Sequence, residues 1–185
     1  AWDNTGNGVT LNNSVLDRAP AVTLQRLSTG NNGLYGLLVT SRGAVSWTDG
    51  GSYSNGWNAG EETVLNPDNV LIDNAGAYSF QSVTINRVNS NNSKFGNGFA
   101  IVSRGAVLLT DVNSDWNEGG HGVNINNLAG SGAIRITSTI ESLNNNSFNN
   151  NANYGLSIYA NGAVTLVGVS ARENSGYGAY IDSSS

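Results

Sequence analysis

The residues best suited to binding chemistry lie in one stretch, at about residues 48–67, between two hydrophobic segments. This stretch contains Tyr53, Trp57, Glu61 and Glu62. Aromatic rings with a polar tip can stack on sugar rings, so the stretch predicts a ligand site for a glycan. The alternative interpretation is a lid folded onto one wall of the protein, with Tyr53 and Trp57 packed beneath it.

A second stretch has the spacing of a calcium-binding loop. Asp111, Asn113 and Asp115 follow a D-x-N-x-D pattern, but the sixth position, where such loops carry glycine, is Trp116. The twelfth position is Gly122, where such loops carry glutamate. The same residues also fit an ordinary strand and corner, so we predict no metal site here.

The amino-acid composition excludes several other kinds of site and partner. His121 is the only histidine and the chain has no cysteine, which excludes the usual transition-metal sites and cysteine-based catalysis. Charged residues make up 11% of the chain and the net charge is −5, which argues against a nucleic-acid partner. No run of eighteen apolar residues occurs, so no membrane insertion is predicted. No cofactor is predicted.

The elements that position these residues follow from an internal repeat. A residue that is usually glycine is followed by apolar residues at the first and third positions after it, which is the alternation of a half-buried strand. In the third copy Asn69 replaces the glycine. Seven copies occur, at residues 8–11, 36–39, 69–72, 98–101, 122–125, 155–158 and 178–181.

A second strand follows each of the first six copies, and a third follows in most of them. The second is predicted at residues 21–24, 44–47, 82–85, 106–109, 133–136 and 163–166. In the third repeat a placement at 77–80 would leave too long a gap before the next repeat, so 82–85 is preferred. The third strand is short, and its inward residues are predicted to be Leu27, Val88, Val112, Ile140 and Val169.

The repeat length dictates how these strands pair. Gly98 and Gly122 begin successive copies, and the intervening residues suffice for three short strands and three corners but not for a helix. Strands that recur in the same order must stack on their own copies, in parallel, about 4.8 Å apart. We therefore predict an all-β, right-handed parallel β-helix of three-strand rungs, with about six complete rungs and a partial seventh in a single domain, residues 1–185. Asn32, Asn117, Asn145 and Asn174 are predicted to form a ladder of amide hydrogen bonds at one corner.

The residues from Gly155 to Asn174 carry a family resemblance. Their pattern, G-h-x-h-x-x-x-G-A-V-x-L-x-x-V-x-A-x-x-N, resembles the right-handed β-helix repeats of the pectate-lyase-like superfamily, and more narrowly repeats of secreted or surface proteins of bacteria. The resemblance implies the β-helix fold and an extracellular or cell-surface location. It does not imply one activity, because that superfamily contains lyases, hydrolases, adhesins, tailspikes and stalks.

Enzymes on such a fold need two carboxylates close together on the outer face. The predicted outward rows of the first strand contain two acids, Asp73 and Asp182, which are several rungs apart. We therefore predict no catalytic residues and no enzyme.

Insertions and ends suggest the remaining functions. Insertions are predicted at about 48–67, 128–131 and 143–153. Neither end carries a capping element, so the strands with Val9 and Leu11, and with Ala179 and Ile181, are predicted to form a polymer interface. The partner would be a second copy stacked head-to-tail, or further rungs of a longer chain. The leading prediction is a non-enzymatic structural solenoid, a stalk, filament or adhesive surface protein. The alternative is a β-helix that binds or degrades carbohydrate through the 48–67 stretch, with surface glycans as partners.

Overall fold

The computed structural model describes residues 1–15, 19–58, 66–76, 80–139 and 146–183. In these residues the chain forms strands and turns, and no helix occurs that is long and apolar enough to cross a membrane. The strands are β1 (Val9–Asn13), β2 (Val22–Gln25), β3 (Ser28–Gly30), β4 (Leu37–Ser41), β5 (Val45–Tyr53), β6 (Val70–Asn74), β7 (Val83–Asn91), β8 (Phe99–Ser103), β9 (Val107–Thr110), β10 (Val123–Asn127), β11 (Ile134–Thr137), β12 (Asn146–Ser147), β13 (Leu156–Ala160), β14 (Val164–Val167), β15 (Val169–Ser170) and β16 (Ala179–Asp182).

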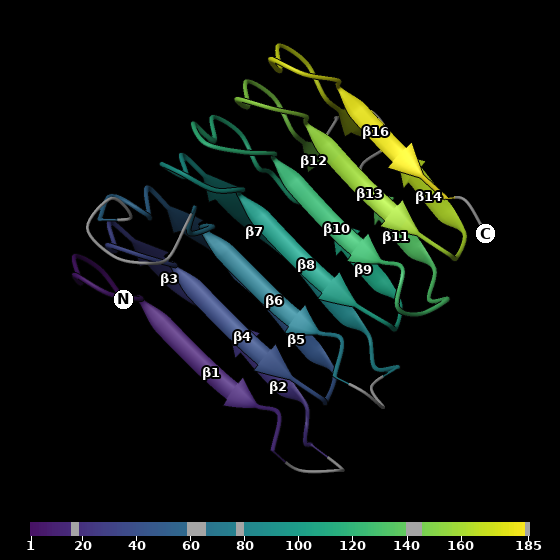
Figure 1. Ribbon diagram of the computed structural model, residues 1–185, viewed down its shortest axis with the longest axis horizontal. Coiled ribbons are helices and arrows are strands. Elements are labelled where there is room, and N and C mark those ends of the chain that lie inside the picture. The colour runs from purple at the N-terminus through teal and green to yellow at the C-terminus, as the bar shows by residue number, and fades with distance from the viewer. Residues whose placement is uncertain (16–18, 59–65, 77–79, 140–145, 184–185) are drawn as a thin grey trace.

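The first sheet contains the seven copies of the repeat. Its strands lie side by side in the order β1-β4-β6-β8-β10-β13-β16, all parallel (Figure 1). The register matches equivalent positions throughout, so that the first apolar residue of each copy lies opposite its counterpart. These residues are Val9, Leu37, Val70, Phe99, Val123, Leu156 and Ala179.

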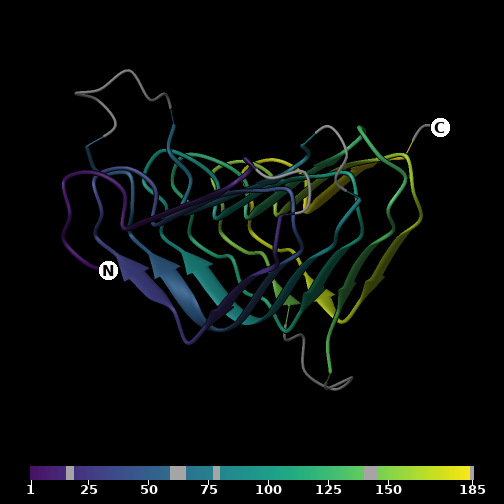
Figure 2. The same cartoon turned by 90° about the horizontal axis from the view of Figure 1, so that it is seen from below.

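The second sheet forms behind the first, again with parallel neighbours. Its order is β14-β11-β9-β7-β5-β2, with β3 paired to the far part of β5. Val83 lies opposite both Val45 and Val107, which confirms the placement of the second strand at 82–85. Viewed from below, successive passes of the chain follow one another from the N-terminal to the C-terminal end (Figure 2).

The third set of strands corrects two predictions. Asn146 lies opposite Val169, and Ser147 pairs with Asn113, so Asn146 occupies the position predicted for Ile140, which lies outside the described residues. Residues from 146 onward are thus part of the regular pairing and not of an insertion at 143–153. Likewise, Thr48–Tyr53 pairs with Asn86–Asn91 as part of β5, so the insertion predicted to begin at 48 does not begin there.

The core lies between the sheets and is lined by the inward rows. Leu37, Val70 and Phe99 are fully buried on the first sheet, as are their counterparts on the second. Trp47, also fully buried, packs edge-on to Phe99 with ring centroids 6.4 Å apart. Its indole nitrogen occupies the space above Gly50, where an added Cβ would lie 2.8 Å from Nε1. The Trp47 side chain therefore fills both its own place in the core and the place that a side chain at position 50 would take.

Each pass of the chain turns through residues in the left-handed region. One such residue follows the second strand, at Arg26 (φ 53°), Asp49 (φ 54°), Arg87 (φ 52°), Asp111 (φ 51°) and Gly168 (φ 64°). Another precedes the asparagine corner, at Asp3, Asn31, Ser54, Asn92, Trp116, Asn150 and Glu173, with φ between 50° and 60°. Seven of these twelve residues are Asn, Asp or Gly, which adopt this region readily, and at the other five, such as Arg26 and Trp116, the sheets on either side hold the turn.

The corner glycines serve close packing instead. An added Cβ at Gly43 would lie 2.1 Å from the Pro20 carbonyl oxygen, and at Gly105 it would lie 2.2 Å from that of Gln81. Neither glycine has a positive φ. A glycine can be required by a positive φ or by the close approach of neighbouring backbones, and here the second reason applies.

Candidate functional site

A ladder of asparagine side chains runs along one corner, as predicted, although one member differs. Asn4 Nδ2 donates to Asn32 Oδ1, and Asn32 Nδ2 donates to Asn55 Oδ1, both at 2.8 Å. In the C-terminal half, Asn117 donates to Asn151 at 2.7 Å and Asn151 to Asn174 at 3.0 Å. Asn151 therefore takes the place predicted for Asn145, which lies outside the described residues. The ladder satisfies buried amides between successive repeats.

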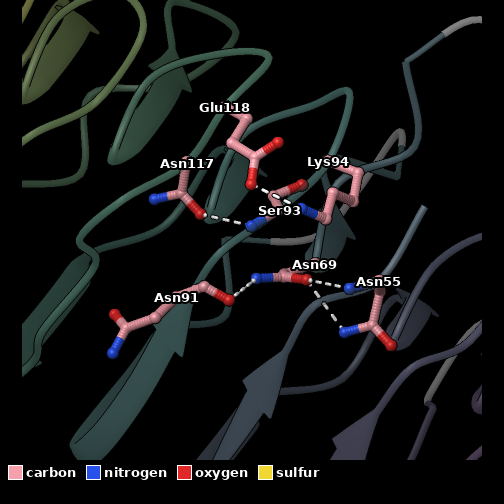
Figure 3. Close-up of polar contacts among 7 residues, drawn as sticks. All are labelled: Asn55, Asn69, Asn91, Ser93, Lys94, Asn117 and Glu118. Carbon is pink, nitrogen blue, oxygen red and sulfur yellow. Dashed lines mark hydrogen bonds and ion pairs between the residues drawn. The ribbon is translucent and has the colours of Figure 1, made fainter. Parts of the chain in front are cut away.

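One repeat maintains the ladder with a compensating exchange of residues. In the other repeats the ladder asparagine packs against the glycine that opens the first strand; an added Cβ at Gly36 would lie 2.5 Å from Asn55 Nδ2. In the third repeat the ladder position is Ser93, and Asn69 stands in place of the glycine. Asn69 Oδ1 accepts from Asn55 Nδ2 at 2.8 Å, and Asn69 Nδ2 donates to the Asn91 carbonyl oxygen at 2.7 Å (Figure 3). Asn69 thus supplies the acceptor for Asn55, and the link to the next ladder residue, Asn117, is made by the Ser93 backbone N–H at 3.0 Å.

The turn after the second strand carries charges of alternating sign. Arg26, Asp49, Arg87 and Asp111 occupy this turn in successive repeats. Arg87 Nε donates to Asp49 Oδ1 at 2.7 Å, and this contact lowers the pKa of Asp49 and raises that of Arg87. The pair is exposed, so it contributes little to stability. We interpret this column of charges as a solvent-exposed edge and not as a charged binding site.

The structure describes two of the four residues predicted to bind a ligand in the 48–67 stretch, Tyr53 and Trp57. Tyr53, at the end of β5, folds its ring back over Gly51, where an added Cβ would lie 2.3 Å from its hydroxyl. Trp57 is half exposed, and its Nε1 donates to the Asn31 carbonyl oxygen at 2.9 Å. Glu61 and Glu62 lie outside the described residues. The role of these four residues stays a prediction.

The acids of the stretch with calcium-loop spacing, Asp111 and Asp115, have hydrogen-bond partners in neighbouring repeats. Asp115 Oδ1 accepts from Ser147 Oγ at 2.8 Å and from the Asn149 backbone N–H at 2.6 Å, and Asp111 accepts from the Thr139 N–H at 2.9 Å. The carboxylates thus link neighbouring repeats. Within the part of the chain that the structure describes, no three His, Cys, Asp or Glu residues gather where they could hold a metal.

The predicted interface residues lie on the two edge strands of the first sheet. Val9 and Leu11 of β1 are partly buried. On β16, Ala179 is exposed and Ile181 is 42% exposed, although both belong to the rows that face the core in the other repeats. Among the described strands, β1 pairs only with β4 and β16 only with β13. Both edges therefore present backbone groups and apolar side chains to solvent.

The structure also forms an aromatic cluster that the sequence analysis did not predict. Four tyrosines gather at the C-terminal end of the first sheet, on its outer face and the turn leading into it: Tyr154, Tyr159, Tyr177 and Tyr180. Ring centroids lie 5.2 Å apart for Tyr154 and Tyr177, 5.8 Å for Tyr154 and Tyr180, and 5.7 Å for Tyr159 and Tyr180.

His121 extends the cluster into the preceding repeat. Its ring centroid lies 4.9 Å from that of Tyr154, and its Nδ1 accepts from the Tyr154 N–H at 3.2 Å. The repeat pattern could have revealed the cluster, because Tyr154 and Tyr177 occupy the same position in successive copies, as do Ser157 and Tyr180. The tyrosines become one feature only when these rows are compared across repeats.

A shallow cleft lies at the asparagine corner of the last repeats. It has a volume of about 300 Å³ and is lined by Trp116, Glu118, Asn150, Ala152, Glu173 and Ser175, with the ladder residues at its base. Glu118 is not available as an unpaired carboxylate, because it forms an ion pair with Lys94 at 2.5 Å (Figure 3).

One buried acid lies at the turn before the first strand. Asp68 is 8% exposed, and its Oδ1 accepts from the N–H and the side-chain amide of Asn97, at 2.7 and 2.8 Å. Burial raises the pKa of Asp68 to about 6, against the smaller opposing effect of these two hydrogen bonds. Burial raises the pKa of the half-buried Tyr35, and the charge of Asp68 raises it further.

Comparisons with known proteins give no name to this arrangement. No protein-family model, no curated protein and no solved structure matches the chain. The function is therefore argued from the geometry.

Proposed function

We propose that the chain is a right-handed parallel β-helix of three-strand rungs, resembling the repeats of the pectate-lyase-like superfamily. The registered stacking of each strand on its own copy supports this fold, and the hand follows from the general preference of parallel crossovers. Each rung cannot cover its own apolar face, so stability comes from rung-to-rung contact.

The function that fits this architecture is a non-enzymatic structural module outside the cell, a stalk or filament of a cell surface. One observation carries the proposal: equivalent residues of seven successive repeats lie opposite one another from β1 to β16, so the described chain is a regular stack that further repeats can extend. Further repeats would pair with the edge strands, and on β16 the core-facing rows hold Ala179 and Ile181.

The strand that pairs with the free edge of β16 belongs either to a further rung of a longer chain or to β1 of a second copy. In the second case the repeat register sets Ala179 against Val9 and Ile181 against Leu11, with the strands again parallel. That contact is head-to-tail and would propagate as a filament.

Electron microscopy of the natural preparation tests the proposal, together with light scattering of the chain before and after Ile181→Lys. A filament module is expected to form rods that the substitution shortens. Thr165→Lys, on the exposed outward row of β14, is the matched control and leaves the rods unchanged. A monomer of unaltered mass at all concentrations for the natural protein would contradict the filament form.

A carbohydrate-binding role for the 48–67 stretch is the second candidate. It is favoured by Trp57, whose side chain is 50% exposed while its indole nitrogen is fixed by Asn31. Loss of glycan binding in Trp57→Ala would support this role, and a glycan array without signal would exclude it.

A further inference from the structure

We propose that the tyrosine cluster at the C-terminal end of the first sheet is a binding site for a neutral glycan, separate from the 48–67 stretch. The site is made of Tyr154, Tyr159, Tyr177 and Tyr180, with Ser157 and Asn124 at its base. It does not depend on the structural role proposed above.

The site lies where the strands turn side chains away from the core. In β13, Leu156 and Ile158 are fully buried in the core, so Ser157 and Tyr159 between and after them face outward. Tyr180 of β16 lies opposite Ser157 in the register, and its ring lies within 6 Å of those of both Tyr154 and Tyr159. The small serine is therefore enclosed by aromatic rings.

Buried polar atoms at the base of the cluster lack partners. Ser157 is 1% exposed, and its Oγ has no hydrogen-bond partner among the described residues. The same holds for Oδ1 of Asn124, the outward residue opposite Ser157 on β10. Leaving such groups without a partner is unfavourable. Both oxygens lie beneath the rings, so the hydroxyl groups of a ligand can donate to them once the Tyr180 ring shifts aside.

The exposed rings suit the apolar face of a sugar. Tyr177 is 62% exposed, and its ring plane is inclined only 15° to that of Tyr180, with centroids 6.4 Å apart. These nearly parallel rings, one from the turn before β16 and one from β16 itself, form a platform and not a cage, so they fit an extended chain of rings better than a compact cation.

The charge of the site favours a neutral ligand. Burial lowers the pKa of His121, so its imidazole is uncharged at neutral pH. Asp182 lies beside Tyr180 and raises the pKa of that hydroxyl, which stays protonated. The site therefore offers no cation to bind the carboxylates of an acidic polysaccharide, and Asp182 would repel them.

Affinity electrophoresis of the full chain tests this site. Hydroxyethylcellulose, galactomannan and dextran in the gel are the neutral probes, and polygalacturonate is the acidic one. We expect retardation by at least one neutral polymer and none by polygalacturonate. Tyr180→Leu, which keeps an apolar cover over Ser157, is expected to weaken retardation at least tenfold. Tyr180→Phe, which keeps the ring, is expected to retain it.

Tyr35→Leu is the matched control, because Tyr35 occupies the same repeat position as Tyr154 but lies in the second repeat. Thermal unfolding of each variant separates binding from folding. The proposal is overturned if no neutral polymer retards the chain, or if Trp57→Ala abolishes retardation while Tyr180→Leu does not. It is also overturned if Tyr180→Leu changes only the mass measured by light scattering, since the cluster would then be a protein interface.

Discussion

At the scale of single residues, the ladder shows how two positions can exchange roles. In the other repeats the glycine that opens the first strand packs against the ladder asparagine. In the third repeat these two positions hold Asn69 and Ser93, and hydrogen bonds still join this repeat to both neighbours. An amide at both positions would overfill the space, and an amide at neither would leave the N–H and the side-chain amide of Asn55 without their acceptor.

This exchange predicts strong coupling between the two positions. Asn69→Gly and Ser93→Asn are each expected to lower the free energy of unfolding by about 2 kcal/mol. The double variant recreates the pairing of the other repeats and is expected to be close to the wild type, a coupling of more than about 1 kcal/mol. Urea denaturation of all four proteins measures it. Ser93→Asn combined with the remote Arg135→Gln is the control, and additive effects in both double variants would refute the exchange.

Asp68 predicts a particular dependence of stability on pH. Its pKa is raised from 3.8 to about 6 in the folded protein, so the folded state holds its proton more tightly than the unfolded state does. The stabilising contribution is therefore full below pH 4 and is lost as the pH rises through 6, with a total on the order of 3 kcal/mol.

Asp68→Asn removes this dependence. Asn7 and Asn97, at the same repeat position, already accept the next repeat's N–H through their amide oxygens. The variant is expected to be more stable than the wild type at pH 7.5 and similar to it at pH 4, as measured by thermal unfolding across that range. A variant less stable at pH 7.5 would show that the charge of Asp68 is itself stabilising.

At the scale of elements, the two left-handed columns bend each pass of the chain. Asn92 is exposed with φ 59°, so its side chain contributes little beyond its tolerance of this conformation. Asn92→Gly is expected to leave stability unchanged or slightly raised, and Asn92→Val to lower it by about 1–2 kcal/mol. Arg135→Val, at an exposed strand position of β11, is the control and should cost little. Equal effects of valine at 92 and 135 would contradict the backbone argument.

The predictability of each element follows from how strongly its residues repeat. The first and second strands alternate apolar and polar residues in every copy, so their positions and register follow from spacing alone. Around residues 138–150 several asparagines match the ladder equally well, and the predicted Asn145 was displaced by Asn151 because the extra residues precede β12. The tyrosine cluster depends on contacts across two strands, which no local pattern contains.

At the scale of the whole molecule, equivalent residues stack in columns from one end to the other, and the termini lie at opposite ends (Figure 1). Each repeat pairs only with the repeat before it and the repeat after it. The unit of stability is therefore the interface between two repeats. Removal of one whole repeat should therefore leave the remaining columns in register.

Deletion of residues 99–122 tests this expectation. It removes β8, β9 and Asn117 together and joins Gly98 to Val123, so β10 can pair with β6 and Asn151 can accept from the Ser93 N–H in place of Asn117. The shortened chain is expected to keep a β-type circular dichroism spectrum, with a smaller denaturant m-value because less surface is buried. Deletion of residues 99–110, which cuts a repeat in half, is the control and should unfold the chain. If both deletions unfold it, the repeats act as one indivisible core and the stacking model is wrong.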